Sequence, residues 1–375
     1  MTLRHTPLFE TARAAGARMV PFAGWEMAVQ FTGLVAEHSA VRSRCGVFDI
    51  SHMGVLGLRG DGAKDVLQGL VPTDLFRIGP GEACYTVLLN EAGGIRDDLI
   101  VYDRGWRAGP GGEPESHELL LVINAACADA DTAWIRSQLE PLGISVEDRK
   151  GDGVLLALQG PEAQVRLEAL CNESLAGLPR FGHRELELAG ATAFVGRTGY
   201  TGEDGFELLL PGPAGTALWN QLLEAGVTPC GLGARDSLRL EAAMHLYGSD
   251  MDATTTPLEA GLGWLVHLEM PKPFIGRAVL ERQSAEGVQR RLVGLELQGR
   301  AIPRHDYPVL AAGAQPGSAP IGRICSGGWS PSLQAGIALA YVPPALARLG
   351  STVAVEIRGK AEPAVVVKRP FYRRT

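Results

Sequence analysis

The sequence predicts an α+β protein in which two mixed α/β subdomains precede an all-β module. Strand and helix patterns alternate through the first part of the 375-residue chain, and short strands separated by turns follow from Arg291. A chain of this length is also too long for one ordinary hydrophobic core. We therefore expect an interleaved two-subdomain region over residues 1–280, a polar linker over 281–290 and a β module over 291–375.

Helical periodicity and turn residues predict the helices in order. The first helix begins at Pro7 with Thr6 as its N-cap, and the third begins after Asp61 as its N-cap. The remaining helices are bounded by glycines, prolines and polar residues. The predicted helices cover residues 7–16, 34–44, 63–70, 126–139, 161–170 and 214–224, with a last one beginning at 233.

Runs of apolar and β-branched residues predict the strands. Tyr85–Leu89 is followed by a Gly-containing turn at 90–94 and a returning apolar run, which is typical of a hairpin. The Gly/Pro-rich stretch Gly105–Ser116 predicts a surface loop. The other predicted strands begin at Gly54 or cover residues 118–123, 206–210, 291–298, 337–341, 352–357 and 364–368.

The composition excludes several classes of protein. A hydrophobic fraction of 46% and a charged fraction of 21% are ordinary for a globular chain, and the net charge of −7 argues against a nucleic-acid partner. The six cysteines are scattered without a CxxC pair, and the eight histidines form no ligand motif, so we expect reduced thiols and no metal. No signal sequence or membrane-spanning run is evident, which predicts a cytoplasmic protein without a membrane partner.

Two adjacent carboxylates, Asp97 and Asp98, lie in the returning strand of the predicted hairpin. Side chains alternate between faces, so Asp97 shares a face with Leu99 and Asp98 shares one with Ile100. Both faces are apolar, and desolvated carboxylates concentrate in active sites. Asp97 lies nearer the turn and should reach water, which favours Asp98 as the poised acid. The structural alternative is that Asp97 caps the turn and Asp98 accepts backbone hydrogen bonds.

A second candidate is Glu203, which lies in a loop with three glycines directly before a predicted strand. If Glu203 points into a cavity, its carboxylate can accept two parallel N–H bonds from an aminopyrimidinone. The structural alternative is a well-built turn in which Glu203 and Asp204 are solvated.

A third candidate is Arg235, in the first turn of the last predicted helix. A positive charge there opposes the helix dipole, and a nearby anionic or carbonyl ligand would explain it. Arg235 and Arg239 share a helical face, and Asp236 can pair with Arg239, so a salt-bridged helix surface is the alternative. His52, just before a predicted strand, fits a structural role better than a catalytic one.

Several motifs occur in a fixed order along the chain, and together they are highly specific. They are Thr6-Pro7-Leu8, Val20-Pro21-Phe22-Ala23-Gly24-Trp25, Phe48-Asp49-Ile50-Ser51-His52-Met53-Gly54, Asn90-Glu91-Ala92-Gly93-Gly94-Ile95, Asp97-Asp98-Leu99-Ile100, Thr198-Gly199-Tyr200-Thr201-Gly202-Glu203-Asp204-Gly205, Ala234-Arg235-Asp236-Ser237-Leu238-Arg239-Leu240-Glu241 and Ile337-Ala338-Leu339-Ala340-Tyr341-Val342. In these motifs the chain resembles the T-protein family of the glycine cleavage system, over nearly its whole length.

The resemblance implies a three-domain cloverleaf, with two mixed α/β domains and a C-terminal β-barrel-like domain around a central folate channel. It implies a tetrahydrofolate-dependent aminomethyltransferase with the lipoylated H-protein as partner. Such an enzyme transfers the methylene carbon of the aminomethyl group to tetrahydrofolate. The products are ammonia, 5,10-methylenetetrahydrofolate and dihydrolipoyl H-protein.

The resemblance also implies roles for individual residues. Asp98 matches the family's functional aspartate, and two residues match positions that hold the folate. Four others match positions in or near the same channel, the last of them in a tail whose end is variable. The folate-holding residues are Glu203 and Arg235, and the channel positions are Tyr85, Asn124, Tyr200 and Tyr372.

Two rival functions remain open at the level of sequence. One is another folate-dependent member of the same superfamily, such as a demethylase or the folate-binding part of a sarcosine- or dimethylglycine-oxidising enzyme. The other is a non-catalytic folate-binding protein of iron–sulfur assembly. That group carries a Lys-Gly-Cys motif where this chain has Arg197-Thr198-Gly199-Tyr200, so the thiol is missing.

Overall fold

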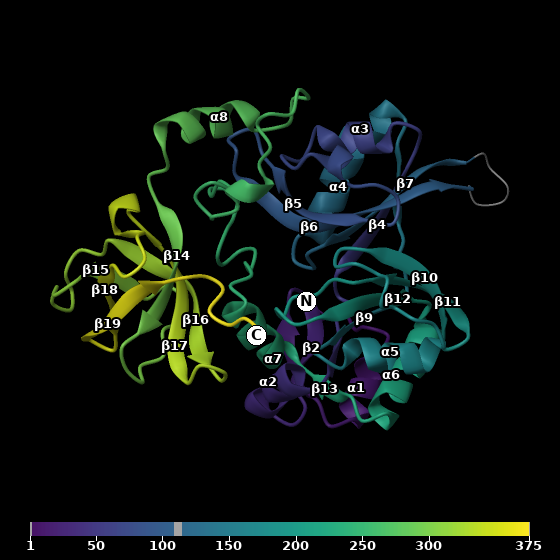
Figure 1. Cartoon of the computed structure of the whole chain (residues 1–375), viewed down its shortest axis with the longest axis horizontal. Helices are drawn as coiled ribbons and strands as arrows, with labels where there is room; N and C mark the ends of the chain where they lie inside the picture. The colour runs from purple at the N-terminus through teal and green to yellow at the C-terminus, as the bar shows by residue number, and fades with distance from the viewer. Residues whose placement is uncertain (1, 109–114, 375) are drawn as a thin grey trace. The chain divides into compact units, whose positions relative to one another are not determined.

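The computed structural model describes residues 2–108 and 115–374, which form two compact units (Figure 1). Neither unit is continuous in the chain. The first comprises Met1–Leu88, Asp97–Gly199 and Glu203–Arg235, and the second comprises Leu89–Arg96, Tyr200–Gly202 and Asp236–Thr375. Within the described ranges, none of the helices has the length and apolar character needed to cross a membrane.

The first unit contains a six-stranded sheet that holds its larger hydrophobic core. Trp219, Phe206 and Leu156 are fully buried there, and burial of such side chains stabilises the fold by roughly 1.5–3 kcal/mol each. All neighbouring strands are antiparallel except β13, which runs parallel to β3. The strand order is β10 (His183–Leu188), β11 (Ala191–Gly196), β12 (Gly205–Leu210), β9 (Val154–Gln159), β3 (Gly46–Asp49) and β13 (Thr228–Cys230). Its helices are α1 (Phe9–Ala14), α2 (Leu34–Ser43), α5 (Ala163–Cys171) and α6 (Gly212–Glu224).

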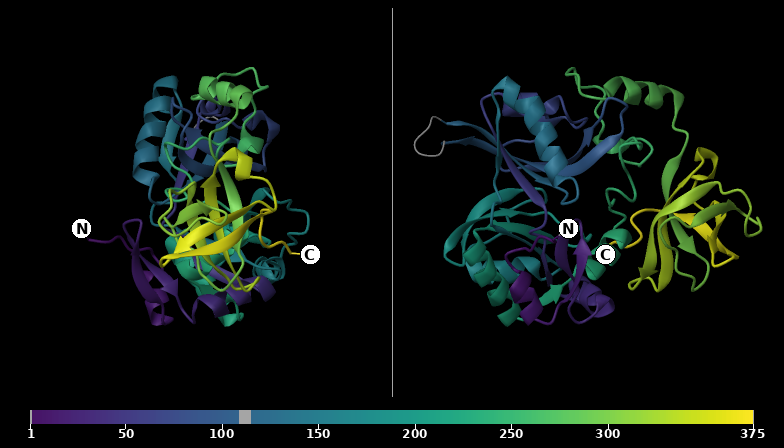
Figure 2. Two further views of the ribbon diagram at one scale, coloured as in Figure 1. Left: turned by 90° about the vertical axis from the view of Figure 1, so that its left-hand side faces the viewer. Right: turned by 180° about the vertical axis from the view of Figure 1, so that it is seen from behind.

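A five-stranded sheet in the same unit carries the two aspartates. The strand order is β5 (Ala83–Leu89), β6 (Ile95–Arg107), β7 (Ser116–Ile123), β4 (Gly54–Arg59) and β8 (Ser145–Asp148). Helix α3 (Ala63–Gln68) contacts β7, and α4 (Ala128–Leu139) contacts β8 and lies over the sheet when seen from behind in Figure 2. Tyr102 of β6 joins the two sheets, because its hydroxyl lies 2.9 Å from that of Thr198.

The second unit contains a closed six-stranded barrel, whose strands are drawn in green to yellow in Figure 1. Its interior is lined by Leu295, Val309 and Val355, all fully buried. The strand order is β14 (Arg291–Leu297), β17 (Ala335–Val342), β16 (Gly322–Ser330), β15 (Pro308–Ala311), β18 (Thr352–Ile357) and β19 (Lys360–Val367). Helix α8 (Arg277–Glu286) comes before the barrel, and α7 (Leu232–Glu241) begins in the first unit and ends in the second.

The mixed α/β class with a C-terminal barrel is confirmed, and so are the predicted helices, with their ends shifted by a few residues. Both proposed N-caps are wrong. The N-cap of α1 is Leu8 and that of α3 is Gly62, and neither makes a side-chain capping bond. Thr6 instead donates its hydroxyl proton to Asp49 Oδ2 at 2.6 Å, and a hydrogen bond to an ionised carboxylate is stronger than one between neutral groups.

Two further predictions need correction, and one hairpin was missed. The polar stretch 281–290 is not a linker throughout, because residues up to Glu286 continue α8. The predicted loop Gly105–Ser116 is too wide, since β6 extends to Arg107 and β7 begins at Ser116; residues 109–114 lie outside the described residues. A hairpin of β1 (Arg18–Phe22) and β2 (Trp25–Gln30) was not predicted, and the aromatic run near residue 22 lies in it.

Candidate functional site

A tight turn sets the position of the two aspartates. Asn90 closes it with two hydrogen bonds, both at 2.9 Å. Its backbone N–H donates to the Gly94 carbonyl, and its side-chain oxygen accepts from the Gly94 backbone N–H. Gly93 takes a φ of +75°, which favours glycine. The strand that leaves this turn then alternates buried and half-buried residues from Ile95 to Ile100.

Asp98 lies on the half-buried face of β6 and is held by two neighbouring strands. The Tyr85 hydroxyl on β5 donates to Asp98 Oδ2 at 3.0 Å. The Asn124 side-chain amide, at the end of β7, donates to Asp98 Oδ1 at 2.8 Å. The structure thus brings together three of the residues that the sequence singled out. Each hydrogen bond fixes the direction of the carboxylate and leaves it partly accessible.

Asp97 lies on the opposite face and is fully buried, so the prediction that it reaches water is wrong. The prediction that it caps the turn is wrong too, since Asn90 closes the turn. Asp97 accepts hydrogen bonds from the Asn124 backbone N–H at 3.0 Å and from the Asn124 side chain at 2.8 Å. The face of the sheet on which each side chain lies, and not its distance from the turn, determines how deeply it is buried.

The same Asn124 amide therefore bridges both carboxylates. Burial raises the pKa of both aspartates above the ordinary carboxyl range; the charge of Asp131 adds to the shift for Asp97, and the charge of Asp97 adds to it for Asp98. The hydrogen bonds from Tyr85 and Asn124 act in the other direction, because they favour the ionised form of Asp98.

Two residues of the chain segment after β7 complete this cluster. Side-chain oxygens of Asp97 and Asp131 and the sulfur of Cys127 lie within 4.8 Å of one another. Donors of these types can hold a cation, but acidic groups are common without one. We assign no metal to the cluster.

Glu203 is buried rather than solvated, and a charge partner holds it. Its Oε1 accepts from Arg42 Nη1 at 2.9 Å, an ion pair between residues 161 positions apart. Asp204 points elsewhere, pairing with Arg197 at 2.6 Å. The glycines of this loop permit close approach, since a Cβ at Gly199 would lie 2.0 Å from the Gln159 side chain.

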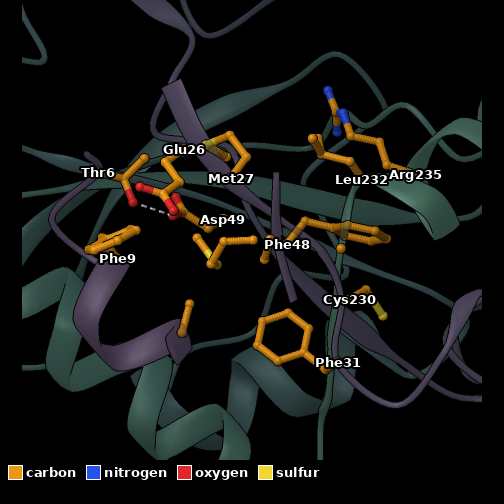
Figure 3. A pocket seen from close by; sticks show the side chains of 14 residues that line it. Thr6, Phe9, Glu26, Met27, Phe31, Phe48, Asp49, Cys230, Leu232 and Arg235 are labelled. Carbon is orange, nitrogen blue, oxygen red and sulfur yellow. Dashed lines mark hydrogen bonds between the residues drawn. The ribbon is translucent and has the colours of Figure 1, made fainter. Parts of the chain in front are cut away.

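Arg235 lies in the first turn of α7 at the edge of a small pocket (Figure 3). At the other side of the pocket, Figure 3 shows the hydrogen bond from Thr6 to Asp49. Burial raises the pKa of Asp49. The enclosed space is about large enough for one water molecule, so this pocket is no folate site by itself. The predicted pair between Asp236 and Arg239 is present at 2.7 Å.

His52 is buried, but it is not the satisfied structural histidine that the sequence favoured. Its Nδ1 makes no hydrogen bond within the described residues. Burial, followed by the positive charges of Arg235 and Lys150, lowers the pKa of His52 to about 3. The ring is therefore neutral at physiological pH, and it contacts Phe22 edge to face.

Tyr200 and Tyr372 belong to the second unit, where each is fixed by a backbone contact. The Tyr200 hydroxyl donates to the His245 carbonyl, and the Tyr372 backbone N–H donates to the Glu241 carbonyl at 3.0 Å. The first unit holds Asp98, Tyr85, Asn124, Glu203 and Arg235.

Sequence reasoning missed Arg42, Cys127 and Asp131. Arg42 lies in a predicted helix far from Glu203, and no local pattern links the two. No local pattern marks Asp131 either, because only folding turns it inward from α4, whereas Asp129, two positions earlier, is exposed.

Comparison with known proteins agrees with this architecture. Residues 8–270 match the "GCVT N-terminal domain" and residues 290–373 match the "Glycine cleavage T-protein C-terminal barrel domain". A relative from Synechococcus sp. (strain RCC307), named aminomethyltransferase, is 71% identical over 99% of both chains. Another aminomethyltransferase, from Prochlorococcus marinus (strain MIT 9303), is 63% identical over 100% of this chain and 99% of its own.

A solved structure is similar over the full length. It is the glycine cleavage system aminomethyltransferase T from Bartonella henselae, with a TM-score of 0.89, 35% identity and coverage of 99% of this chain and 98% of that one. These matches favour the aminomethyltransferase over the demethylase and the iron–sulfur assembly protein. The chain therefore belongs to the glycine cleavage T-protein family of aminomethyltransferases.

Proposed function

We propose that Asp98 is the catalytic carboxylate of this aminomethyltransferase and that it acts on bound tetrahydrofolate. The observation that carries the proposal is the placement of Asp98, which stays partly accessible while two hydrogen bonds fix its direction. Asp97 is sealed on the opposite face. A fixed carboxylate at an accessible position can stabilise developing positive charge without reorganising.

The second part of the proposal concerns binding. Glu203 accepts hydrogen bonds from the aminopyrimidinone edge of the pterin, and Arg235 supplies a positive charge to it. Arg42 supports this role of Glu203 because its ion pair orients the carboxylate before the ligand arrives. Tyr85 and Asn124, in the same unit, are proposed to line the same site. The fixed orientation of the folate N5 toward the aminomethyl carbon then contributes a large part of the rate enhancement.

The partner in the proposed reaction is a lipoylated H-protein that carries the aminomethyl group on a lipoyl sulfur. The methylene carbon passes to N5 of tetrahydrofolate, ammonia leaves, and the lipoyl sulfur departs as a thiol. Asp98 steadies the positive charge of the iminium while N10 closes the ring. No electrons are gained or lost overall, and the proposed reaction uses no metal.

We also propose that the enzyme works in the cytoplasm. All six cysteines are free thiols, which suits a reducing compartment.

The test replaces one carboxylate at a time. Asp98→Asn should lower kcat by about 100-fold or more, with folate affinity changed only a few-fold, because it removes charge from the reacting centre and keeps the shape. The assay is ammonia release from aminomethylated H-protein, with and without tetrahydrofolate, alongside a separate folate titration.

Asp97→Asn is the matched control and should cost much less activity. Equal losses of turnover and folate affinity in Asp98→Asn would assign Asp98 to binding alone. A worse loss in Asp97→Asn would move the catalytic role to the buried neighbour.

A further inference from the structure

The cluster behind Asp98 contains more carboxylates than it can hold as anions. Asp97 is fully buried, Asp131 is 2% exposed, and carboxylate oxygens of the two lie within 4.8 Å of each other. Two buried anions this close repel each other strongly, and a hydrogen bond between two carboxyl groups forms only when one of them carries a proton. A proton shared by the Asp97–Asp131 pair leaves it one negative charge and relieves this repulsion.

The surroundings decide which member holds the charge. Asp131 lies in the first turn of α4, where the helix dipole stabilises an anion. Asp97 lies in a strand, which has no comparable dipole, and next to the second carboxylate of Asp98. The lower-energy arrangement puts the negative charge on Asp131 and the proton on Asp97.

We propose that Asp131 is a positioning residue: it takes the charge of the buried pair, keeps Asp97 neutral, and so lets Asp98 ionise beside an uncharged neighbour. This inference rests on the proposed role of Asp98. Asn124 connects the parts, since its amide donates to both Asp97 and Asp98.

Among the described residues, the titratable groups that act on the pair fit this arrangement. From β6 there is Asp98, from β5 the Tyr85 hydroxyl on Asp98, and from the start of α4 the thiol of Cys127. Burial raises the pKa of Cys127, so the thiol stays neutral and adds no charge. Asp129, in the same helix turn, is exposed and lies 3.7 Å from Arg4.

The first experiment detects the proton directly and does not depend on catalysis. Infrared spectra of the whole enzyme, recorded from about pH 5 to about pH 9, should show a carboxylic-acid C=O band that persists above about pH 6, where ordinary carboxyls are ionised. Asp131→Asn should reduce the intensity of the band by about one carboxyl at the alkaline end of this range, because Asp97 then ionises against an amide donor. Asp97→Asn should reduce it by the same amount.

The second experiment reads the effect on Asp98. In Asp131→Asn the acid limb of the kcat–pH profile should move up by about one pH unit, because an ionised Asp97 now repels charge on Asp98. The matched control Asp129→Asn removes the same charge from the same turn and should leave both the band and the limb in place, because its side chain is in water.

The two readouts separate the possible failures. If the wild-type enzyme shows no acid band above about pH 6, or if the isolated enzyme contains a stoichiometric metal, the shared proton is refuted. If the band behaves as expected but the limb does not move, Asp131 does not act on Asp98. If Asp98→Asn retains full turnover while the band persists, the proposed function fails and the proton pair stands. The wild-type titration decides the first point even if Asp131→Asn does not fold.

Discussion

At the scale of single residues, Asp98 differs from Asp97 in the property that chemistry needs, which is contact with solvent. The two carboxylates are adjacent in the chain and share the Asn124 amide, yet one faces a packed interior and the other a partly open face. One hydrogen-bond donor thus serves both a structural carboxylate and the proposed catalytic one, which couples their ionisation.

His52 gives a prediction on stability against pH. Its pKa is about 3 in the folded chain against an ordinary value of 6.5, so between these limits the unfolded chain binds a proton that the folded chain does not. Folding is therefore favoured as the pH rises through this window and weakened as it falls. His52→Gln should reduce the acid-side slope of the unfolding free energy by up to about 1.4 kcal/mol per pH unit.

Urea unfolding at about pH 4, 5 and 6.5 measures this slope. His5→Gln is the control for loss of an exposed histidine, one that stacks on Phe9 and pairs with Glu26. An unchanged slope in His52→Gln would show that the ring is not buried as the structure places it.

At the scale of elements, the β5–β6 hairpin fixes where Asp98 lies. Its turn depends on Gly94, because an ideal Cβ there would lie 1.9 Å from the Ala253 carbonyl oxygen. No real contact is that short, so the backbone has to move. The adjacent Asn90 side chain also donates to the same carbonyl at 2.8 Å, which leaves little room for movement.

Gly94→Ala should therefore lower the unfolding free energy by about 1–3 kcal/mol. Gly299→Ala in the same unit is the control, because that position has no heavy atom within 4 Å of an added Cβ, and it should stay within about 0.5 kcal/mol of wild type. Equal urea midpoints for the two variants would contradict the tight contact at Gly94.

At the scale of the whole molecule, charge is unevenly distributed. The net charge is −7, but the C-terminal tail carries Lys368, Arg373 and Arg374 on its exposed side. An acidic lipoylated H-protein would be attracted to this tail despite the overall repulsion. We offer this docking as a proposal. The division of the chain into domains 1–280 and 291–375 and the central folate channel are proposals as well.

The docking proposal predicts that the Kd for H-protein rises several-fold between about 50 and 200 mM salt. The double change Lys368→Gln with Arg373→Gln should weaken binding and flatten the salt dependence. Arg348→Gln, an exposed arginine outside the tail, should do neither. Affinity that is insensitive to salt in the wild type would exclude an electrostatic tail.

The fold class was accessible from the sequence because periodicity and turn residues are local properties. The apolar run, turn and returning run around residue 90 predicted the hairpin, and the short strands after Arg291 predicted a β module that proves to be a barrel. Helix α8 and the helix caps were predicted wrongly for the same reason. A polar stretch has the same composition in a linker as in a surface helix. A hydroxyl before a helix is the same in sequence whether it caps that helix or contacts a distant carboxylate.

Local sequence pattern is enough to establish that two carboxylates enter a strand from a glycine turn, that Glu203 follows a second glycine turn and that Arg235 lies at the start of a helix. Folding establishes which aspartate is buried, that Arg42 pairs with Glu203 and that Asp131 lies beside Asp97. The reason is physical. Alternation along a strand is set by neighbouring residues, whereas burial and ionisation are set by groups that folding brings together from distant parts of the chain.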